Sequence, residues 1–463
     1  MRTLLHNLVI SGKGNERRQA QLLVEGKQIG AVLAPDEVVS ADLRIDLGGA
    51  LALPGAIDGH VHFDDPGFTQ REDFATGTRA AAAGGVTMVV DMPCTSLPPV
   101  TSAAYLDNKL GIIEGKANVD FMLWGGVSSN VLENPDWRGQ LEELINSGVG
   151  AIKVYLLSGM ETFKGLGKEQ VFEVLEITGR HGIPVGVHAE DRHVVDAAKS
   201  AVLARGGESP LDYAASRPAE GEITAAKTLR NLCRQTGARI HIVHIASREA
   251  LDIVTAARSE GLPLSAETCP HYLLFTDHDL DRLGALLKTA PVVKSRRDRE
   301  GLWRGLESGE LLFVASDHAA GVWPEEKHTG SIWTDYGGVP GVELLLPALY
   351  SEGVAKGRIT LERLVEITSR APAEFFGVGG RKGRIEKGYD ADFSVIDEDS
   401  TWTVRASELH NKNRYTPLEG MTLQGRIQET WVRGRRVFFR DQHGREAFSE
   451  QPSGRFIKRG GAS

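Results

Sequence analysis

Eight short apolar runs that alternate with helix-like segments constrain the fold of this chain most strongly. The runs lie at 56–63, 86–92, 119–125, 150–157, 183–189, 239–245, 262–268 and 311–317. The clearest segments between them, GKEQVFEVLEITGRHG and GEITAAKTLRNLCRQTG, each end at a glycine that can cap a helix. Apolar strands that alternate with helices predict a parallel α/β sheet covered on both faces, and eight strands can close a (β/α)8 TIM-type barrel. An open doubly wound sheet is the alternative, but no Gly-x-Gly-x-x-Gly follows the first run.

Both ends of the chain carry a different pattern, which is typical of short β-strands. Strand-like runs lie at 4–10, 21–33, 390–397 and 429–439, and the second of them contains a Gly26-Lys27 turn signal. We expect one small β-sandwich domain built from both termini, with two unrelated β extensions as the alternative. The predicted division is residues 1–52 for the first part of the sandwich, 53–375 for the barrel, and 376–463 for the second part and a C-terminal tail.

Polar residues stand at or near the ends of the apolar runs. They are four histidines, one lysine and one aspartate: His60, His62, Lys153, His188, His244 and Asp317. His60 and His62 are two residues apart, so both point to the same side of a strand. The strand ends of a barrel converge on the face where active sites form, so we expect all six side chains in one pocket. A single histidine at a strand end is more often structural, but that reading does not explain the joint pattern.

The chemistry of these six residues predicts a metal centre. Neutral imidazoles and a carboxylate bind divalent cations, with zinc as the default. The Lys153 ammonium cannot bind a cation, but its amine can react with carbon dioxide to give a carbamate that bridges two metal ions. A hydroxide generated by two such ions would attack a scissile carbonyl. Asp317 would then serve as the proton shuttle, taking the proton and passing it to the leaving nitrogen.

Charge and cysteine content exclude several other functions. The chain has 53 basic and 62 acidic residues, so it has no overall basic field for nucleic acid or for an anionic membrane. No run approaches the ~20 apolar residues of a membrane helix. The three cysteines, Cys94, Cys233 and Cys269, lie far apart and are odd in number, which is typical of reduced thiols. We expect a cytoplasmic protein with neither a nucleic-acid nor a membrane partner.

Several motifs occur in the order in which one known superfamily carries them. They are PGAIDGHVHFDDPG, EDFATGTRAAAAGGVTMVVDMP, GAIKVYLLSG, VGVHAED, VHIAS, ETCPHYLLF, VASDH and the late GRIEKGYDADFSVID. On these motifs the chain resembles the cyclic amidohydrolase branch of the amidohydrolase superfamily over nearly its whole length. The resemblance implies a distorted (β/α)8 barrel, two metal ions bridged by a carboxylated lysine, and a homotetramer or homodimer. It implies the same six ligands, and Lys153 argues against the single-metal deaminases.

Within this branch the chain resembles allantoinases most, then dihydroorotases and the hydantoinases or dihydropyrimidinases. Dihydroorotases place an arginine and an asparagine where this chain has Asp64 and Cys94, and Asp64 would repel a substrate carboxylate. We therefore expect a small neutral cyclic amide or ureide as substrate, with Asp64, Cys94, Ser158 and His271 as candidate substrate contacts. Asp64 matches hydantoinases, so a hydantoinase-type or other cyclic imide hydrolase is the alternative. Non-catalytic relatives have lost metal ligands, whereas all six are present here.

Overall fold

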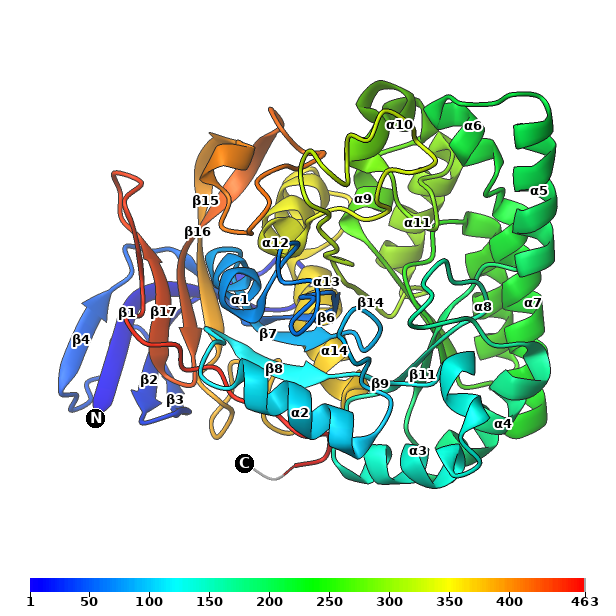
Figure 1. Ribbon diagram of the computed structural model, residues 1–463. Coiled ribbons are helices and arrows are strands. Elements are labelled where there is room, and N and C mark those ends of the chain that lie inside the picture. Colours follow the sequence, from blue (N-terminus) through cyan, green and yellow to red (C-terminus); the bar gives the residue numbers. More distant parts are fainter. Residues whose placement is uncertain (462–463) are drawn as a thin grey trace.

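A closed barrel of eight parallel strands lies at the centre of the computed structural model, which describes residues 1–461 (Figure 1). The strands are β6 (Ala56–Val61), β7 (Val86–Asp91), β8 (Asp120–Leu123), β10 (Ile152–Tyr155), β11 (Val185–His188), β12 (Ile240–Ile242), β13 (Leu264–Thr268) and β14 (Phe313–Val314). The short β9 (Gly125–Gly126) continues β8 and pairs with β10. A parallel bridge between Val61 and His318 joins the end of the eighth strand to the first. The predicted (β/α)8 barrel is confirmed, and each predicted apolar run contains one barrel strand.

Helices cover the outside of the barrel and fill its longer connections. Between successive strands lie α1 (Phe74–Ala83), α2 (Ala103–Ile113), α3 (Trp137–Asn146), α4 (Lys168–Arg180), α7 (Ala219–Thr236), α8 (Arg248–Ser259) and α11 (Arg296–Ser308). Additional helices are α5 (Arg192–Ala204), α6 (Pro210–Ala215), α9 (Pro270–Leu274) and α10 (Asp277–Leu283), and α12 (Leu345–Leu349), α13 (Leu361–Val365) and α14 (Ala371–Phe375) follow β14. The α7 helix ends at Gly237 with a φ of 64°, which glycine adopts without strain. None of the helices within residues 1–461 has the length and apolar character needed to cross a bilayer.

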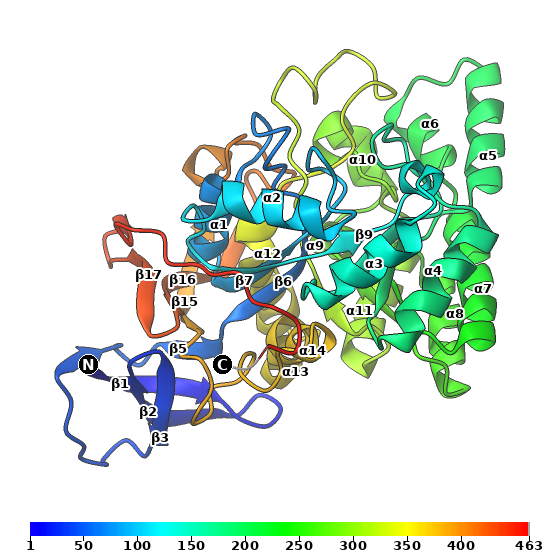
Figure 2. The ribbon, with the colours of Figure 1, turned by 60° about the horizontal axis from the view of Figure 1, so that its bottom comes forward.

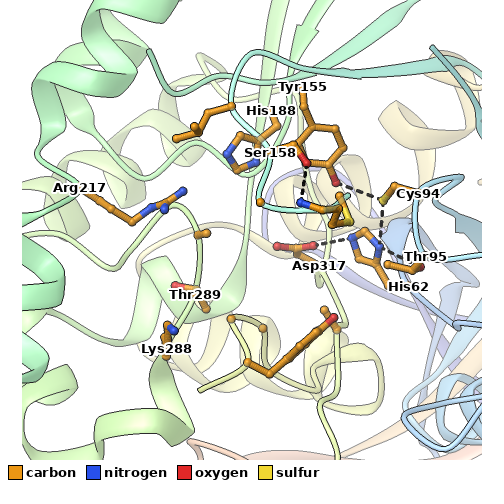
Figure 3. A pocket seen from close by; sticks show the side chains of 18 of the residues that line it. His62, Cys94, Thr95, Tyr155, Ser158, His188, Arg217, Lys288, Thr289 and Asp317 are labelled. Atoms are coloured by element: carbon orange, nitrogen blue, oxygen red, sulfur yellow. Dashed lines mark hydrogen bonds and ion pairs between the residues drawn. The ribbon is translucent and has the colours of Figure 1, made fainter. Parts of the chain in front are cut away.

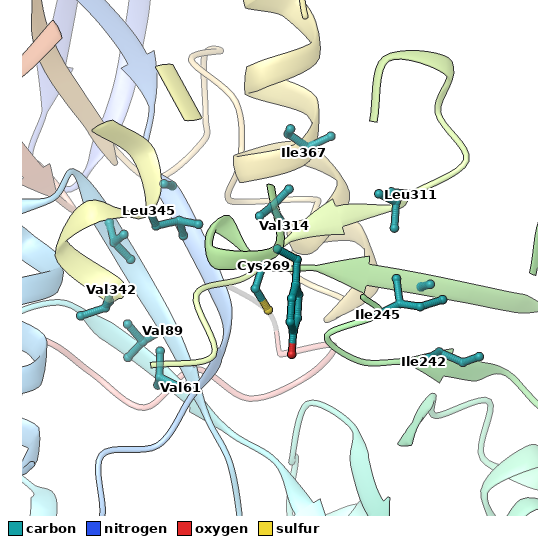
Figure 4. Close-up of a cluster of buried hydrophobic side chains, with 14 of the residues drawn as sticks. Val61, Val89, Ile242, Ile245, Cys269, Leu311, Val314, Val342, Leu345 and Ile367 are labelled. Carbon is teal, nitrogen blue, oxygen red and sulfur yellow. The ribbon is translucent and has the colours of Figure 1, made fainter. Parts of the chain in front are cut away.

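Apolar side chains fill both the inside and the outside of the barrel wall. Trp124, Met122 and Phe313 are fully buried in one cluster, and a side chain on Gly186 would come within 2.6 Å of the Trp124 ring. On the outer side, residues such as Val89 and Val314 belong to the larger core that packs strands against helices (Figure 4). Because the interior is packed, a binding site can form only above the strand ends.

Strands from both ends of the chain form a second, nine-stranded sheet. They are β1 (Arg2–Ser11), β2 (Arg17–Glu25), β3 (Gln28–Leu33), β4 (Leu43–Asp46), β5 (Leu51–Pro54), β15 (Phe393–Thr403), β16 (Thr422–Val432), β17 (Arg435–Arg440) and β18 (Glu446–Phe448). Their order is β18-β17-β16-β15-β5-β1-β2-β3, with β4 beside β1, so strands from both ends of the chain share one sheet at one side of the barrel (Figure 2). Leu22, Phe393 and Trp431 meet in one buried cluster. The predicted β domain from both termini is confirmed, while the boundaries at 52 and 375 stay a prediction.

His410 ties the segment between β15 and β16 to the rest of the molecule. Its Nδ1 lies 3.0 Å from Glu343 Oε1, and its Nε2 lies 2.8 Å from Glu446 Oε2. Burial opposes protonation of the ring, but the hydrogen bonds to Glu343 and Glu446 outweigh it and raise the pKa of His410 to about 9. The ring is therefore charged at neutral pH and joins two carboxylates.

We expect His410→Gln to lower the free energy of unfolding by about 2 kcal/mol at pH 6, because charged hydrogen bonds are lost. A pKa raised in the folded state gives stability that is fully present below about pH 6.5 and is lost as pH rises through about 9. The difference between wild type and variant should therefore shrink towards zero by pH 10. Urea unfolding at pH 6, 8 and 10 measures it, and an equal difference at all three values would contradict the assignment.

Candidate active site

The six predicted strand-end residues lie together at one end of the barrel. His60 Nε2 is 3.1 Å and His62 Nε2 is 3.3 Å from Asp317 Oδ1. The His60 ring centroid lies 5.2 Å from that of His62 and 5.4 Å from that of His244. His244 and Asp317 have positive φ values of 41° and 48°, a conformation that residues other than glycine keep only where the surroundings enforce it. The close-up of the cavity shows the Asp317 carboxylate beside His62 (Figure 3).

The hydrogen bonding of these residues fits a bound cation. Within residues 1–461, three buried nitrogen atoms of the set make no hydrogen bond: Lys153 Nζ, His244 Nδ1 and His60 Nε2, whose 3.1 Å approach to Asp317 Oδ1 lacks hydrogen-bond geometry. His188 Nδ1 faces His244 Nε2 at 3.1 Å, so the two ring nitrogens would share either a proton or a cation. Unsatisfied buried nitrogens are uncommon in a folded protein. The two imidazole nitrogens, of His60 and His244, form with the Asp317 carboxylate the donor set that zinc and similar ions prefer.

Two buried glutamates orient the histidine rings. Glu267 Oε1 lies 2.7 Å from His60 Nδ1, which leaves His60 Nε2 facing Asp317. Glu190 Oε2 lies 2.9 Å from His188 Nε2, and Arg217 Nε donates to Glu190 Oε1 at 3.1 Å. Carboxylates in this position fix the ring and the tautomer of a metal-binding histidine. Sequence reasoning missed both glutamates, although each stands at a strand end, in VHAE and in SAET.

Burial sets the protonation of most groups in the site. Three imidazoles have their pKa lowered by burial: His60, His188 and His244. They are therefore neutral at neutral pH, the form that binds metal. Burial also opposes protonation of His62, but nearby Cys94 and Asp317 raise its pKa to about 10. Burial lowers the pKa of Lys153 to about 8, so its amine loses a proton more readily than that of an exposed lysine.

A cavity of about 660 Å³ opens in front of these residues. Two of the predicted substrate contacts, Cys94 and Ser158, border it, and Cys94 Sγ lies 3.2 Å from Tyr155 Oη (Figure 3). The other two, Asp64 and His271, are buried and are not among the residues that border the cavity. Both Asp64 carboxylate oxygens lack a hydrogen-bond partner within residues 1–461, and burial raises the pKa of Asp64 to about 7.

Several residues that the sequence did not single out also border the cavity: Arg71, Tyr155, Arg217, Lys288, Thr289 and Tyr336. Arg71 forms an ion pair with Glu326 at 2.7 Å, and Arg217 forms one with Glu190 at 2.5 Å. A carboxylate therefore balances the positive charge of each guanidinium. Most of these residues come from loops. Their place beside the cavity depends on how the loops pack, and no local pattern in the sequence signals it.

The barrel places three imidazoles and one carboxylate at the border of the cavity, those of His62, His188, His244 and Asp317, while His60 and Lys153 are buried and do not border it. The Amidohydrolase family matches residues 51–437. The allantoinase of Rubrobacter xylanophilus is 39% identical over 98% of this chain and 97% of its own, and that of Streptomyces avermitilis is 38% identical over 97% of both. The solved L-hydantoinase (dihydropyrimidinase) from Arthrobacter aurescens has a TM-score of 0.92 at 30% identity and covers 99% of both chains.

The chain therefore belongs to the amidohydrolase family. The predicted class, a hydrolase that resembles allantoinases and hydantoinases, is confirmed. Members of this family generally bind divalent metals, and His60, His244 and Asp317 are one group here whose ligand atoms all lie within 4.8 Å of one another.

We expect Glu190→Gln to weaken metal retention about 10- to 100-fold, because His188 loses its charged partner. Metal content after dialysis against graded chelator concentrations measures this change. Glu173→Gln is the matched control, because Glu173 is a half-buried carboxylate that pairs with Arg138 and does not border the cavity. Equal retention in the Glu190 variant and the wild type would contradict the orienting role of Glu190.

Proposed function

We propose that this enzyme opens the amide bond of a neutral cyclic amide or ureide, and that allantoin is its substrate. The observation that carries the proposal is the set of four histidines, one lysine and one aspartate at one end of the barrel, four of which border the cavity. This set occurs in a chain that is 38–39% identical to two allantoinases over nearly its full length. All six residues of the predicted centre are present, which supports catalysis over a scaffold role.

We propose that two divalent metal ions, with zinc as the first candidate, bind to the six strand-end residues: His60, His62, Lys153, His188, His244 and Asp317. Within residues 1–461 the buried Lys153 Nζ makes no hydrogen bond, which supports a carbamate formed from carbon dioxide, because a carbamate is an anion and an ammonium cannot bind a cation. The bound ions would supply Lewis-acid polarisation of the amide carbonyl and of the attacking water.

The side chains of this chain supply the proton transfers and the shape of the site. The Asp317 carboxylate borders the cavity, so it can take a proton from the attacking water and return it to the leaving nitrogen. Cys94 and Ser158 border the same cavity and are our proposed substrate contacts. Asp64 and His271 are buried and do not border the cavity, and their contact with the substrate stays a prediction.

The compensated charges around the cavity support a neutral substrate. Glu326 pairs with Arg71 and Glu190 pairs with Arg217, so neither guanidinium is free to bind a carboxylate. A buried Asp64 near the site adds a negative charge whenever it is ionised. Ionised Asp64 would repel the carboxylate of a charged ring such as dihydroorotate, and neither guanidinium is free to offset that repulsion.

A hydantoinase or dihydropyrimidinase activity is the second candidate. It is favoured by the TM-score of 0.92 to the Arthrobacter aurescens L-hydantoinase and by Asp64, which matches hydantoinases at this position. We further propose a homotetramer or homodimer, which rests on the family resemblance. A cytoplasmic location is supported by the free, buried thiols of Cys94, Cys233 and Cys269.

Ring opening by the zinc-loaded protein tests the function. We expect allantoin to have a higher kcat/KM than hydantoin, dihydrouracil or phthalimide, and dihydroorotate to fall at least about tenfold below allantoin because of its charge. Asp317→Asn is the matched control and should lose at least about 100-fold in kcat, because the proton shuttle is removed. Preference for hydantoin or dihydrouracil would establish the second candidate, and efficient dihydroorotate turnover would refute the neutral-ring proposal.

The Lys153 carbamate has its own test by native mass spectrometry. We expect the metal-loaded protein to lose the mass of one carbon dioxide on mild acidification, because a carbamate decomposes in acid. Lys153→Ala should show no such loss and should bind less metal. An unmodified Lys153 in active, metal-loaded enzyme would refute the carbamate.

A further inference from the structure

One wall of the substrate cavity is an irregular segment, residues 333–338. Within it, Trp333, Asp335, Tyr336, Gly337 and Gly338 all border the cavity. The segment belongs to no helix or strand, so no ladder of backbone hydrogen bonds fixes it. It leads directly to Val339, whose backbone pairs with His318, the residue after Asp317.

Two buried lysines converge on this wall. Lys288 Nζ donates to the backbone carbonyl oxygens of Asp335 at 2.5 Å and of Trp333 at 3.5 Å. Lys327 Nζ donates to the carbonyl oxygens of Gly338 at 2.7 Å and of Tyr336 at 3.0 Å. Within residues 1–461, these four carbonyl oxygens accept no other hydrogen bond. The two lysine amino groups therefore hold this segment by hydrogen bonds that a helix or strand would otherwise make.

The burial of both lysines indicates a dedicated role. Lys288 is 5% exposed and Lys327 is fully buried, and neither forms an ion pair with a carboxylate anywhere in residues 1–461. A buried ammonium without a carboxylate is costly unless other acceptors surround it. Here the acceptors are the wall carbonyls, and the Lys288 ammonium also lies 4.9 Å from the centre of the Tyr213 ring.

Further hydrogen bonds near the two lysines connect the wall to neighbouring segments. Gly338 N donates to the Lys288 carbonyl at 2.9 Å, and Tyr213 Oη donates to the Thr289 carbonyl at 2.9 Å. Gly338 has a φ of 156°, and a side chain there would lie 2.5 Å from the Ala319 carbonyl oxygen. Lys288 and Thr289 border the cavity on the side away from Cys94 (Figure 3). The wall is thus held between the loop before α11 and the residues that follow Asp317.

We propose that Lys288 and Lys327 are positioning residues that fix the 333–338 wall of the cavity and thereby set substrate affinity. The inference rests on the proposed function of the cavity, but the fixing of the wall can be tested without any substrate. Neither lysine belongs to the strand-end set, so their loss should act on substrate binding and not on metal content. A loss of binding that is equal in the ground and transition states raises KM and leaves kcat little changed.

The test compares Lys288→Met and Lys327→Met with the metal-loaded wild type. We expect KM for the best substrate of the panel to rise at least about tenfold, kcat to change less than about threefold, and metal content to stay equal. Hydrogen exchange of the amides in residues 333–338 should become at least about tenfold faster. Lys288→Arg, which keeps a charged donor at the cavity edge, should recover most of the loss in KM.

Leu361→Ala is the matched control for general destabilisation, because Leu361 is fully buried in α13 and does not border the cavity. It should lower thermal stability without changing KM or the exchange of residues 333–338.

An unchanged KM in both lysine variants, or a fall in kcat that follows lost metal, would overturn the proposal. If Lys327→Met does not fold, Lys288→Met decides the outcome. If none of the five cyclic compounds is turned over, the proposed function is wrong. Unchanged hydrogen exchange of residues 333–338 in the lysine variants would separately show that the lysines do not fix the wall.

Discussion

The contact between the first and the eighth strand of the barrel is the constraint on which the site depends. His62 N donates to the His318 carbonyl at 2.8 Å, and Ser316 N donates to Asp58 Oδ1 at 2.9 Å. These bonds hold two segments that are far apart in the sequence at a fixed register. The register brings His60 and His62 to within 3.3 Å of Asp317. Without this closure the donor atoms would belong to opposite edges of an open sheet.

Closure also explains why strained backbone is tolerated at the site. Asp317 has a φ of 48° and Asp64 a φ of 53°, and such positions cost about 1–3 kcal/mol each for residues other than glycine. Asp317 lies between Ser316 and His318, both of which bond to the first strand. The surrounding hydrogen bonds therefore enforce its conformation. The strain turns the Asp317 carboxylate towards the histidines and the cavity.

The sequence predicted the barrel and the strand-end residues because both depend on local patterns. Short apolar runs signal buried parallel strands, and topology alone brings their ends together. Glu190 and Glu267 stand at strand ends too, but their role is visible only once each faces a histidine nitrogen. Lys288 and Lys327 carry no signal at all, because their acceptors are backbone carbonyl oxygens of a loop without periodicity.

The residues proposed to do the chemistry and those proposed to set substrate specificity therefore differ in how well the sequence predicts them. The groups proposed to do the chemistry are side chains on rigid strand ends, so residue type and spacing are enough to identify them. The wall at residues 333–338 borders the cavity from a loop, and Lys288 and Lys327 bond to its backbone carbonyl oxygens. Substitutions at Lys288 or Lys327 would reshape this wall without touching any strand-end residue. Proteins that share these strand-end residues can therefore differ in the ring that they bind. The specificity for one ring depends on loop contacts that residue type alone does not reveal.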